Sequence, residues 1–314
     1  MVRSLDEVCP HLGGLLPFVH TPFGADGAPD LPRLRQHLRW LAAGHPDRPA
    51  CYFVACGTGE FWSLGLDEYR AVVTAAVDEV GGRVPVVVGV GYGTSLAFEF
   101  VRAAEVAGAD ALLVFPPYLV GGPQEGLYRH YAALAAATDR AVLIYNRDNA
   151  VFVAATVARL AAAHPNIIGV KDGYGDLGLL AEMRRLLGEG FLLMNGMPTA
   201  ELYAPSYLRA GIRPYSPSAI EFLPELAWVY DHALARGDAT LVERLSAAFY
   251  RPYQALRSLV PGYGIALTKA ALALRGMPSG GVRPPLVEAS PEHVAMLADL
   301  IARGLELAAT HQGG

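Results

Sequence analysis

The sequence predicts an α/β protein, a (β/α)₈ TIM barrel followed by a C-terminal helical extension. Short apolar runs, nearly continuous in Val, Leu, Ile and Phe, alternate with longer segments of helical period. Such runs are typical of parallel strands that are buried on both faces. After Ser218 the strand-like runs stop and only helical patterns continue. A doubly wound sheet is the alternative architecture for the same alternation.

Eight apolar runs are the predicted strands, and the segments between them carry apolar side chains at helical spacing. The runs are Gly14–His20, Cys51–Ala55, Val84–Val88, Ala111–Phe115, Ala141–Tyr145, Ile167–Val170, Phe191–Met194 and, more weakly, Ile212–Ser216. The clearest helical segments are Leu31–Ala43, Leu66–Val80 and Gln124–Ala137. Since eight strand–helix units close a barrel, we expect residues 1–220 to form the catalytic barrel.

The remaining residues, 221–314, are expected to form a helical extension that packs on the barrel. Their four helical patterns are separated by clusters of Gly and Pro, which interrupt helices. The patterns are Leu223–Ala235, Ala239–Leu256, Gly262–Ala273 and Pro291–Ala308.

Composition excludes several classes of function. The chain has 314 residues, is 53% hydrophobic and carries a formal net charge of −5 without a basic patch, so nucleic acid is not an expected partner. No apolar run reaches the roughly 20 residues of a membrane helix, and the N-terminus lacks the apolar core of a signal peptide. We therefore expect a cytoplasmic protein. Its three cysteines form no CxxC pair and its nine histidines no HxxxH or HExxH motif, so no metal is expected.

Lysine is rare in this chain: of 25 basic residues, only Lys171 and Lys269 are lysine. Arginine replaces lysine in solvated roles but not where a neutral amine must attack a carbonyl. Lys171 directly follows the run Ile167–Val170, so it is expected at the barrel mouth, where desolvation favours a nucleophilic amine. The alternative is an ion pair of Lys171 with Asp172 or Glu60. Lys269 is expected to be solvated or to lie between subunits.

Polar and glycine-rich segments follow the predicted strands, at the face where barrel enzymes carry their active sites. The backbone amides around Gly57–Gly59 are expected to hold a carboxylate, although a simple tight turn is the alternative. Gly89–Gly93 lacks the full dinucleotide fingerprint, so no nicotinamide cofactor is expected. Tyr145 is compatible with simple core packing. Arg147 suits a bidentate carboxylate contact, or else a surface ion pair.

Several of these segments occur together in the order of a known family. They are Gly57–Glu60, Tyr118, Gln124–Tyr128 (QEGLY), Tyr145–Asn146 and Asn166–Lys171 (NIIGVK). Over about residues 14–220 the sequence resembles the dihydrodipicolinate synthase / N-acetylneuraminate lyase family, and the helical tail fits as well. The resemblance implies a barrel enzyme that needs no cofactor, assembles as a homotetramer and uses Lys171 as Schiff-base nucleophile.

The resemblance also implies roles for individual residues. Tyr118 matches the acid/base tyrosine of the family, and the amides of Gly57 and Thr58, with the Thr58 hydroxyl, would hold a carboxylate beside the ketone of the substrate. Candidates for the distal hydroxyl and carboxylate groups of the substrate are Arg147, Asn195 and Ser216.

Three features resemble those family members that dehydrate and decarboxylate a keto-deoxy sugar diacid. They are Gly57–Phe61 (GTGEF) followed by Ser63–Leu64, Tyr145–Ala150 (YNRDNA), and Gly169–Gly173 (GVKDG) followed by Gly175–Asp176. The chain lacks the second threonine, at Gly57, and the arginine, at Ala150, that are usual in dihydrodipicolinate synthases. Cys56 stands where a glycine is expected.

Two other functions remain open at this stage. One is a class I aldolase that cleaves a 2-keto-3-deoxy sugar acid to pyruvate on the same scaffold. The other is a non-catalytic paralogue that binds a sugar acid.

Overall fold

Six parallel strands form one sheet in which each strand pairs with the next along the chain. The computed structural model describes residues 3–44 and 51–311. The start of the predicted barrel, at residue 1, and the end of the predicted extension, at residue 314, therefore lie outside the described residues. The strands are β1 (Tyr52–Val54), β2 (Val86–Val90), β3 (Ala111–Val114), β4 (Ala141–Asn146), β5 (Ile167–Asp172) and β6 (Leu192–Asn195).

The first and eighth predicted strands appear as isolated bridges that close the sheet into a barrel. Leu15 and Asn195 each bridge Tyr215, and Phe18 bridges Phe53. Pro17 and Pro214 lie beside the bridging residues, and proline cannot donate a ladder hydrogen bond. The predicted (β/α)₈ barrel is therefore confirmed, with two of its strands shortened.

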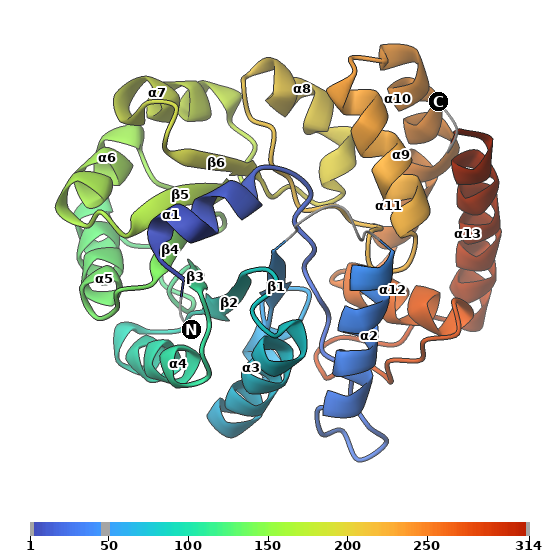
Figure 1. The fold of residues 1–314 in the computed structure, drawn as a ribbon, viewed down its shortest axis with the longest axis horizontal. Helices are drawn as coiled ribbons and strands as arrows, with labels where there is room; N and C mark the ends of the chain where they lie inside the picture. The colour runs from blue at the N-terminus through green and yellow to red at the C-terminus, as the bar shows by residue number, and fades with distance from the viewer. Residues whose placement is uncertain (1–2, 45–50, 312–314) are drawn as a thin grey trace.

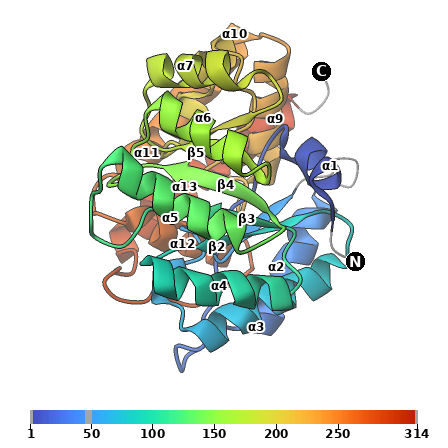
Figure 2. The same ribbon diagram turned by 90° about the vertical axis from the view of Figure 1, so that its left-hand side faces the viewer.

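Helices surround the strands on the outside (Figure 1). In chain order they are α2 (Leu31–Ala43), α3 (Leu66–Val80), α4 (Thr94–Val106), α5 (Gln124–Ala136), α6 (Ala154–Ala163), α7 (Leu177–Leu187) and α8 (Ala204–Arg209). Figure 2 shows α4 to α7 as an outer layer over β2 to β5. Before them, the short helix α1 (Leu5–Val8) and the 3₁₀ turn η1 (Cys9–Leu12) bring Val8 and Leu12 into one apolar cluster with the barrel interior. Two 3₁₀ turns, η2 (Phe61–Ser63) and η3 (Ala200–Leu202), follow β1 and β6.

The C-terminal helices lie together on one side of the barrel (Figure 1). They are α9 (Pro224–Ala235), α10 (Ala239–Leu245), the π turn η4 (Ser246–Tyr250), α11 (Arg251–Arg257), α12 (Tyr263–Leu274) and α13 (Pro291–His311). The predicted single helix Ala239–Leu256 is thus divided by a π turn. Pro252 explains the irregularity, because it cannot donate the i→i−4 hydrogen bond to Ala248. No helix in the described part of the chain is both long and apolar enough to cross a membrane.

A buried ion pair joins the extension to the barrel. Lys269 Nζ on α12 lies 2.6 Å from Glu60 Oε1 in the loop after β1, and both side chains are fully buried. The same amine donates to the Gly281 carbonyl at 2.6 Å, and the Arg283 N–H donates to Glu60 Oε2 at 2.9 Å. The expectation that Lys269 is solvated or lies between subunits is therefore wrong, because Lys269 forms a buried ion pair with Glu60 of the same chain.

Removing one partner of this pair should destabilise the fold strongly. Lys269→Met leaves the Glu60 carboxylate buried without its cation, so we expect a loss of about 3–5 kcal/mol in the free energy of unfolding. Arg251→Met is the matched control, because Arg251 pairs with Glu243 on the surface and its loss should cost at most about 1 kcal/mol. Denaturant unfolding of both variants measures the difference, and equal midpoints would contradict the structural role of the pair.

Candidate active site

A cavity of about 490 Å³ opens where the barrel strands end. Its walls come from the barrel, including Lys171, and from the extension, including Gln254 and Arg257. Four of the residues predicted beside Lys171 line this cavity with it: Gly57, Thr58, Arg147 and Ser216. The structure therefore brings most of the predicted site together.

Lys171 lies near the end of β5, beside Tyr145 on β4, its partner in the strand register. Its side chain is buried, with Nζ 3.9 Å from the centre of the Tyr145 ring and 4.6 Å from that of Phe18. A Cβ atom at Gly196 would lie 2.7 Å from Nζ, so only glycine leaves room for the amine here. Aromatic rings and glycine backbone thus fix the position of the amine.

The carboxylates near Lys171 are engaged elsewhere. Asp172 Oδ1 accepts from Asn146 Nδ2 at 3.0 Å, and Asp172 Oδ2 accepts from the Tyr207 hydroxyl at 2.5 Å. Glu60 is paired with Lys269. Neither alternative ion pair considered for Lys171 forms, and within residues 3–44 and 51–311 no carboxylate lies within ion-pair distance of its amine. The amine therefore faces the cavity without an acidic partner.

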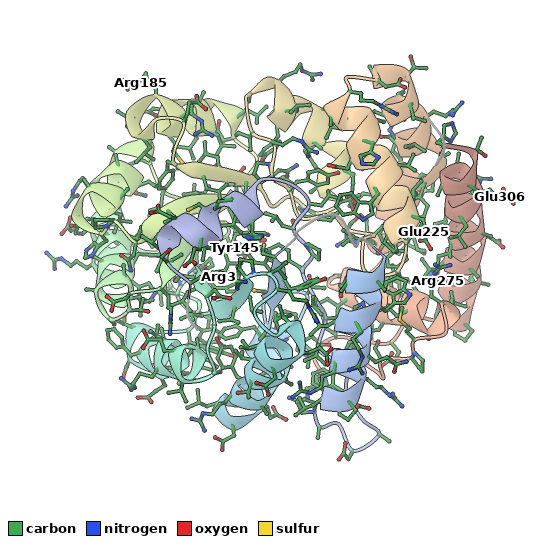
Figure 3. The ribbon with its side chains drawn as sticks, in the orientation of Figure 1. Arg3, Tyr145, Arg185, Glu225, Arg275 and Glu306 are labelled. Atoms are coloured by element: carbon green, nitrogen blue, oxygen red, sulfur yellow. The ribbon has the colours of Figure 1, made fainter. Side chains whose placement is uncertain are left out.

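Tyr145 is the tyrosine that the structure places beside Lys171 (labelled near the barrel centre in Figure 3). Its hydroxyl accepts a hydrogen bond of 3.1 Å from Arg147 Nη1. Burial by itself would raise the pKa of this phenol, but the positive charges of Lys171 and Arg147 and their hydrogen bonds lower it. Core packing alone therefore does not describe Tyr145, because its hydroxyl also interacts with Arg147 and Lys171. Tyr145 ends one predicted strand and Lys171 directly follows the next predicted strand. This was the signal in the sequence that could have placed the two side chains together.

Tyr118 needs a correction, because it does not lie in the cavity with Lys171. Its side chain is 65% exposed and lines a neighbouring hollow of about 350 Å³ with Tyr92 and Leu119. The chain runs through Pro116 and Pro117 before reaching Tyr118, which carries the side chain outward from the end of β3. The structure therefore places Tyr118 apart from Lys171, whereas Tyr145 lies beside it.

Asn195 needs the same correction. Its side chain is fully buried, with Nδ2 donating to the Ala200 carbonyl at 2.9 Å and Oδ1 accepting from the Met197 N–H at 3.1 Å. Both ends of the amide thus hold the loop after β6, and the residue is not among those that line the cavity.

The loop after β1 is closed by backbone hydrogen bonds within the turn. The N–H groups of Glu60 and Phe61 donate to the carbonyls of Gly57 and Cys56, which closes the turn. In the described part of the chain, the N–H groups of Gly57 and Thr58 donate to no backbone carbonyl, so they can receive a carboxylate. Burial raises the pKa of the Cys56 thiol beneath them, which keeps it un-ionised.

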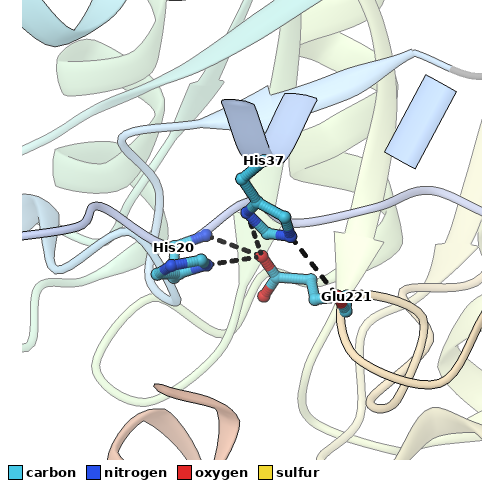
Figure 4. A group of neighbouring side chains, drawn as sticks. All are labelled: His20, His37 and Glu221. Atoms are coloured by element: carbon cyan, nitrogen blue, oxygen red, sulfur yellow. Dashed lines mark hydrogen bonds and ion pairs between the residues drawn. The ribbon is translucent and has the colours of Figure 1, made fainter. Parts of the chain in front are cut away.

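A buried cluster of His20, His37 and Glu221 adjoins the cavity, which Glu221 also lines (Figure 4). Glu221 Oε1 accepts from both the backbone N–H and Nδ1 of His20, at 2.9 and 3.0 Å, and His37 Nε2 lies 3.3 Å from the Glu221 carbonyl. This is the one grouping of described residues with the composition of a metal site. Both His20 contacts reach the same oxygen of Glu221, while His20 Nε2 and His37 Nδ1 are buried without a hydrogen-bond partner among the described residues.

Burial dominates the titration of this cluster. It raises the pKa of Glu221 to about 7, and together with the neighbouring His20 it lowers the pKa of His37 to about 3. Burial also lowers the pKa of His20, helped by the charge of Lys269. The cluster therefore favours two neutral imidazoles, with a carboxyl group that holds its proton up to nearly neutral pH.

Glu221→Gln should change how stability depends on pH. The pKa of Glu221 rises from its ordinary 4.5 to about 7 on folding, so its contribution to stability falls as the pH rises through this interval. Glutamine has no proton to lose, so the variant should gain stability relative to the natural chain between about pH 4.5 and 7, by on the order of 3 kcal/mol, with no further change above that range. Thermal unfolding over pH 4.5–8 measures this. A constant difference in Tm would mean that Glu221 does not titrate in this interval.

Comparison with known proteins places the chain in a family. The model of the dihydrodipicolinate synthetase family matches residues 11–303. A probable 5-dehydro-4-deoxyglucarate dehydratase of Streptomyces griseus is 47% identical over 305 residues, which cover 96% of this chain and 94% of that protein. A protein of the same name from Chelativorans is 43% identical, covering 92% and 95%.

Solved structures give the same result. Dihydrodipicolinate synthase from Bacillus clausii is 28% identical and superposes with a TM-score of 0.84, covering 94% of this chain and 98% of that one. A family member from E. coli K12, solved in complex with pyruvate, is 25% identical with a TM-score of 0.82, covering 93% and 98%. The chain therefore belongs to the dihydrodipicolinate synthetase family.

Proposed function

We propose that this chain is a 5-dehydro-4-deoxyglucarate dehydratase. It removes water and CO₂ from 5-dehydro-4-deoxy-D-glucarate and releases 2,5-dioxopentanoate. The observation that carries the proposal is the buried amine of Lys171, which faces the cavity without an acidic partner. The relatives from Streptomyces griseus and Chelativorans, which match more than nine-tenths of the chain, support the choice of substrate.

The reaction begins when Lys171 condenses with the C5 ketone and releases water. The protonated imine withdraws electrons, so C4 loses a proton and an enamine forms. The enamine expels the C3 hydroxyl group as water, which leaves an iminium conjugated through C4 and C3. The C1–C2 bond then breaks, its electron pair moves into this conjugated system, and CO₂ leaves. Protonation, tautomerisation at C2 and hydrolysis of the imine release 2,5-dioxopentanoate and the free lysine.

Two groups near Lys171 fit the other tasks of this reaction. The Tyr145 hydroxyl is suited to transferring protons during imine formation and elimination, because it lies beside the amine and its pKa is lowered. The amides of Gly57 and Thr58 are suited to holding the carboxylate next to the ketone, since they reach the same cavity.

A class I aldolase would share the same lysine and imine, so the products must decide between them. The purified protein should convert 5-dehydro-4-deoxyglucarate to equal amounts of CO₂ and 2,5-dioxopentanoate. An aldolase acting on a 2-keto-3-deoxy sugar acid would release pyruvate instead. Pyruvate as the main product would overturn the dehydratase proposal, and no turnover of any keto-deoxy sugar acid would favour a binding paralogue.

The two tyrosines can be separated by matched substitutions. Tyr145→Phe should lower kcat by about 10²–10⁴-fold, because it removes the hydroxyl beside the reacting amine. Tyr118→Phe should lower kcat much less, since Tyr118 lies outside the cavity of Lys171. Steady-state kinetics of both variants makes the comparison, and a larger loss at Tyr118 would restore the sequence-based assignment.

We extend the proposal to a homo-oligomer. The exposed apolar side chains of Tyr118, Leu119 and Val120 beside the site entrance support it, because such a patch is typical of a contact surface. The tetrameric state and the cytoplasmic location stay predictions from the sequence, as does the absence of nucleic acid among the partners.

A further inference from the structure

Arg257, from the C-terminal extension, reaches the same cavity as Lys171. It is the last residue of α11. Gly262 and the first two residues of α12, Tyr263 and Gly264, also line the cavity. The cavity therefore has one wall from the barrel, with the reacting amine, and another from the extension, with a guanidinium group.

The guanidinium is held in place by its neighbours. Arg257 Nη1 donates to Thr199 Oγ1 at 2.9 Å, and Thr199 in turn donates to Gln254 Oε1. A Cβ atom at position 264 would lie 2.6 Å from Nη2 and 2.8 Å from Nε, so the group lies directly against the backbone of Gly264. These contacts fix the orientation of the planar donor group before any ligand arrives.

The charge of Arg257 has no anion within the described residues. Three cationic side chains line the cavity: Lys171, Arg147 and Arg257. Lys171 is the reacting amine, and Arg147 already pairs with Asp148 at 2.6 Å. Arg257 forms no ion pair in the part of the chain that the structure describes.

Glu201 is an acidic group that senses the charge of Arg257: burial raises the pKa of Glu201, and Arg257 lowers it. Its carboxylate oxygens accept from the N–H and Oγ of Ser218, at 2.8 and 2.9 Å. Glu201 therefore does not occupy the donor face of Arg257, which remains available to a ligand.

We infer that Arg257 binds the carboxylate at the end of the substrate remote from the ketone. This inference rests on the proposed function, whose substrate has two carboxylates, and the amides of Gly57 and Thr58 are suited to only one of them. A guanidinium fork matches a carboxylate geometrically and electrostatically. Arg257 thereby selects diacids over monoacids, a role that the sequence suggested for Arg147.

The contact must act mainly on binding. The C1 carboxylate loses its charge as it leaves as CO₂, so a cation that holds it does not favour the transition state over the bound substrate. Loss of Arg257 should therefore raise KM far more than it lowers kcat.

Imine trapping tests the subsite without relying on dehydratase turnover. We would reduce the protein with borohydride in the presence of 2-oxoadipate, a six-carbon 2-oxo diacid, or of 2-oxohexanoate, the monoacid of equal length. Neither has a hydroxyl group to expel, so both report only on imine formation. The natural chain should be half-modified at a diacid concentration about 10- to 100-fold below that of the monoacid, because the carboxylate gains charge-assisted hydrogen bonds.

Arg257→Ala should abolish this preference while trapping of pyruvate, which lacks the distal carboxylate, stays unchanged. Arg251→Ala is the control, since this exposed residue of the same helix pairs with Glu243 and lies outside the cavity. If Arg257→Ala fails to trap pyruvate, Arg257→Lys, which keeps the charge but loses the fork, should show a reduced preference for the diacid.

An unchanged diacid preference in the variant that traps pyruvate normally would overturn the inference. No preference in the natural chain would overturn it as well. Failure of the proposed function looks different: the preference would persist, but 5-dehydro-4-deoxyglucarate would not be converted.

Discussion

The site depends on an amine that is kept away from carboxylates. A lysine paired with an acid holds its proton tightly, whereas attack on a ketone requires the neutral amine. In the barrel each nearby acid has another partner: Asp172 bonds to Asn146 and Tyr207, and Glu60 bonds to Lys269. The rings of Tyr145 and Phe18 then hold the amine in position at the cavity.

The extension completes this arrangement. Lys269 on α12 neutralises Glu60, and Glu60 lies in the loop that presents the amides of Gly57 and Thr58. Arg257 and Gly264 form the opposite wall of the cavity. The extension thus contributes both a structural ion pair and part of the cavity wall, and changes at these residues should alter ligand binding as well as stability.

Much of the fold followed from the sequence, because its signals are local. Helix α2 has the predicted bounds, since Asp30 caps its first turn with a side-chain bond to the Arg33 N–H. Helix α3 ends as predicted before Gly81, which adopts the left-handed conformation that glycine favours. The bounds of the first and eighth strands were harder to predict. Pro17 and Pro214 cannot donate ladder hydrogen bonds, so these strands form only isolated bridges with the adjacent strands.

The site was less predictable where partners are distant in the sequence. The motif around Lys171 predicted an amine at the barrel mouth, where the structure places it. Glu60 and Lys269 are separated by 209 positions, so nothing local showed that Lys269 is buried. The distinction between Tyr145 and Tyr118 depends on the course of the loop after β3. Arg257 was not among the predicted site residues, because only the packed extension brings it to the cavity.

The central claim is that Lys171, and no other amine, carries the substrate. The chain contains just two lysines, so mass mapping after borohydride reduction with 5-dehydro-4-deoxyglucarate gives an unambiguous answer. We expect one adduct, on the peptide that contains Lys171, and none on the peptide that contains Lys269. An adduct on Lys269, or continued turnover without any adduct on Lys171, would contradict it.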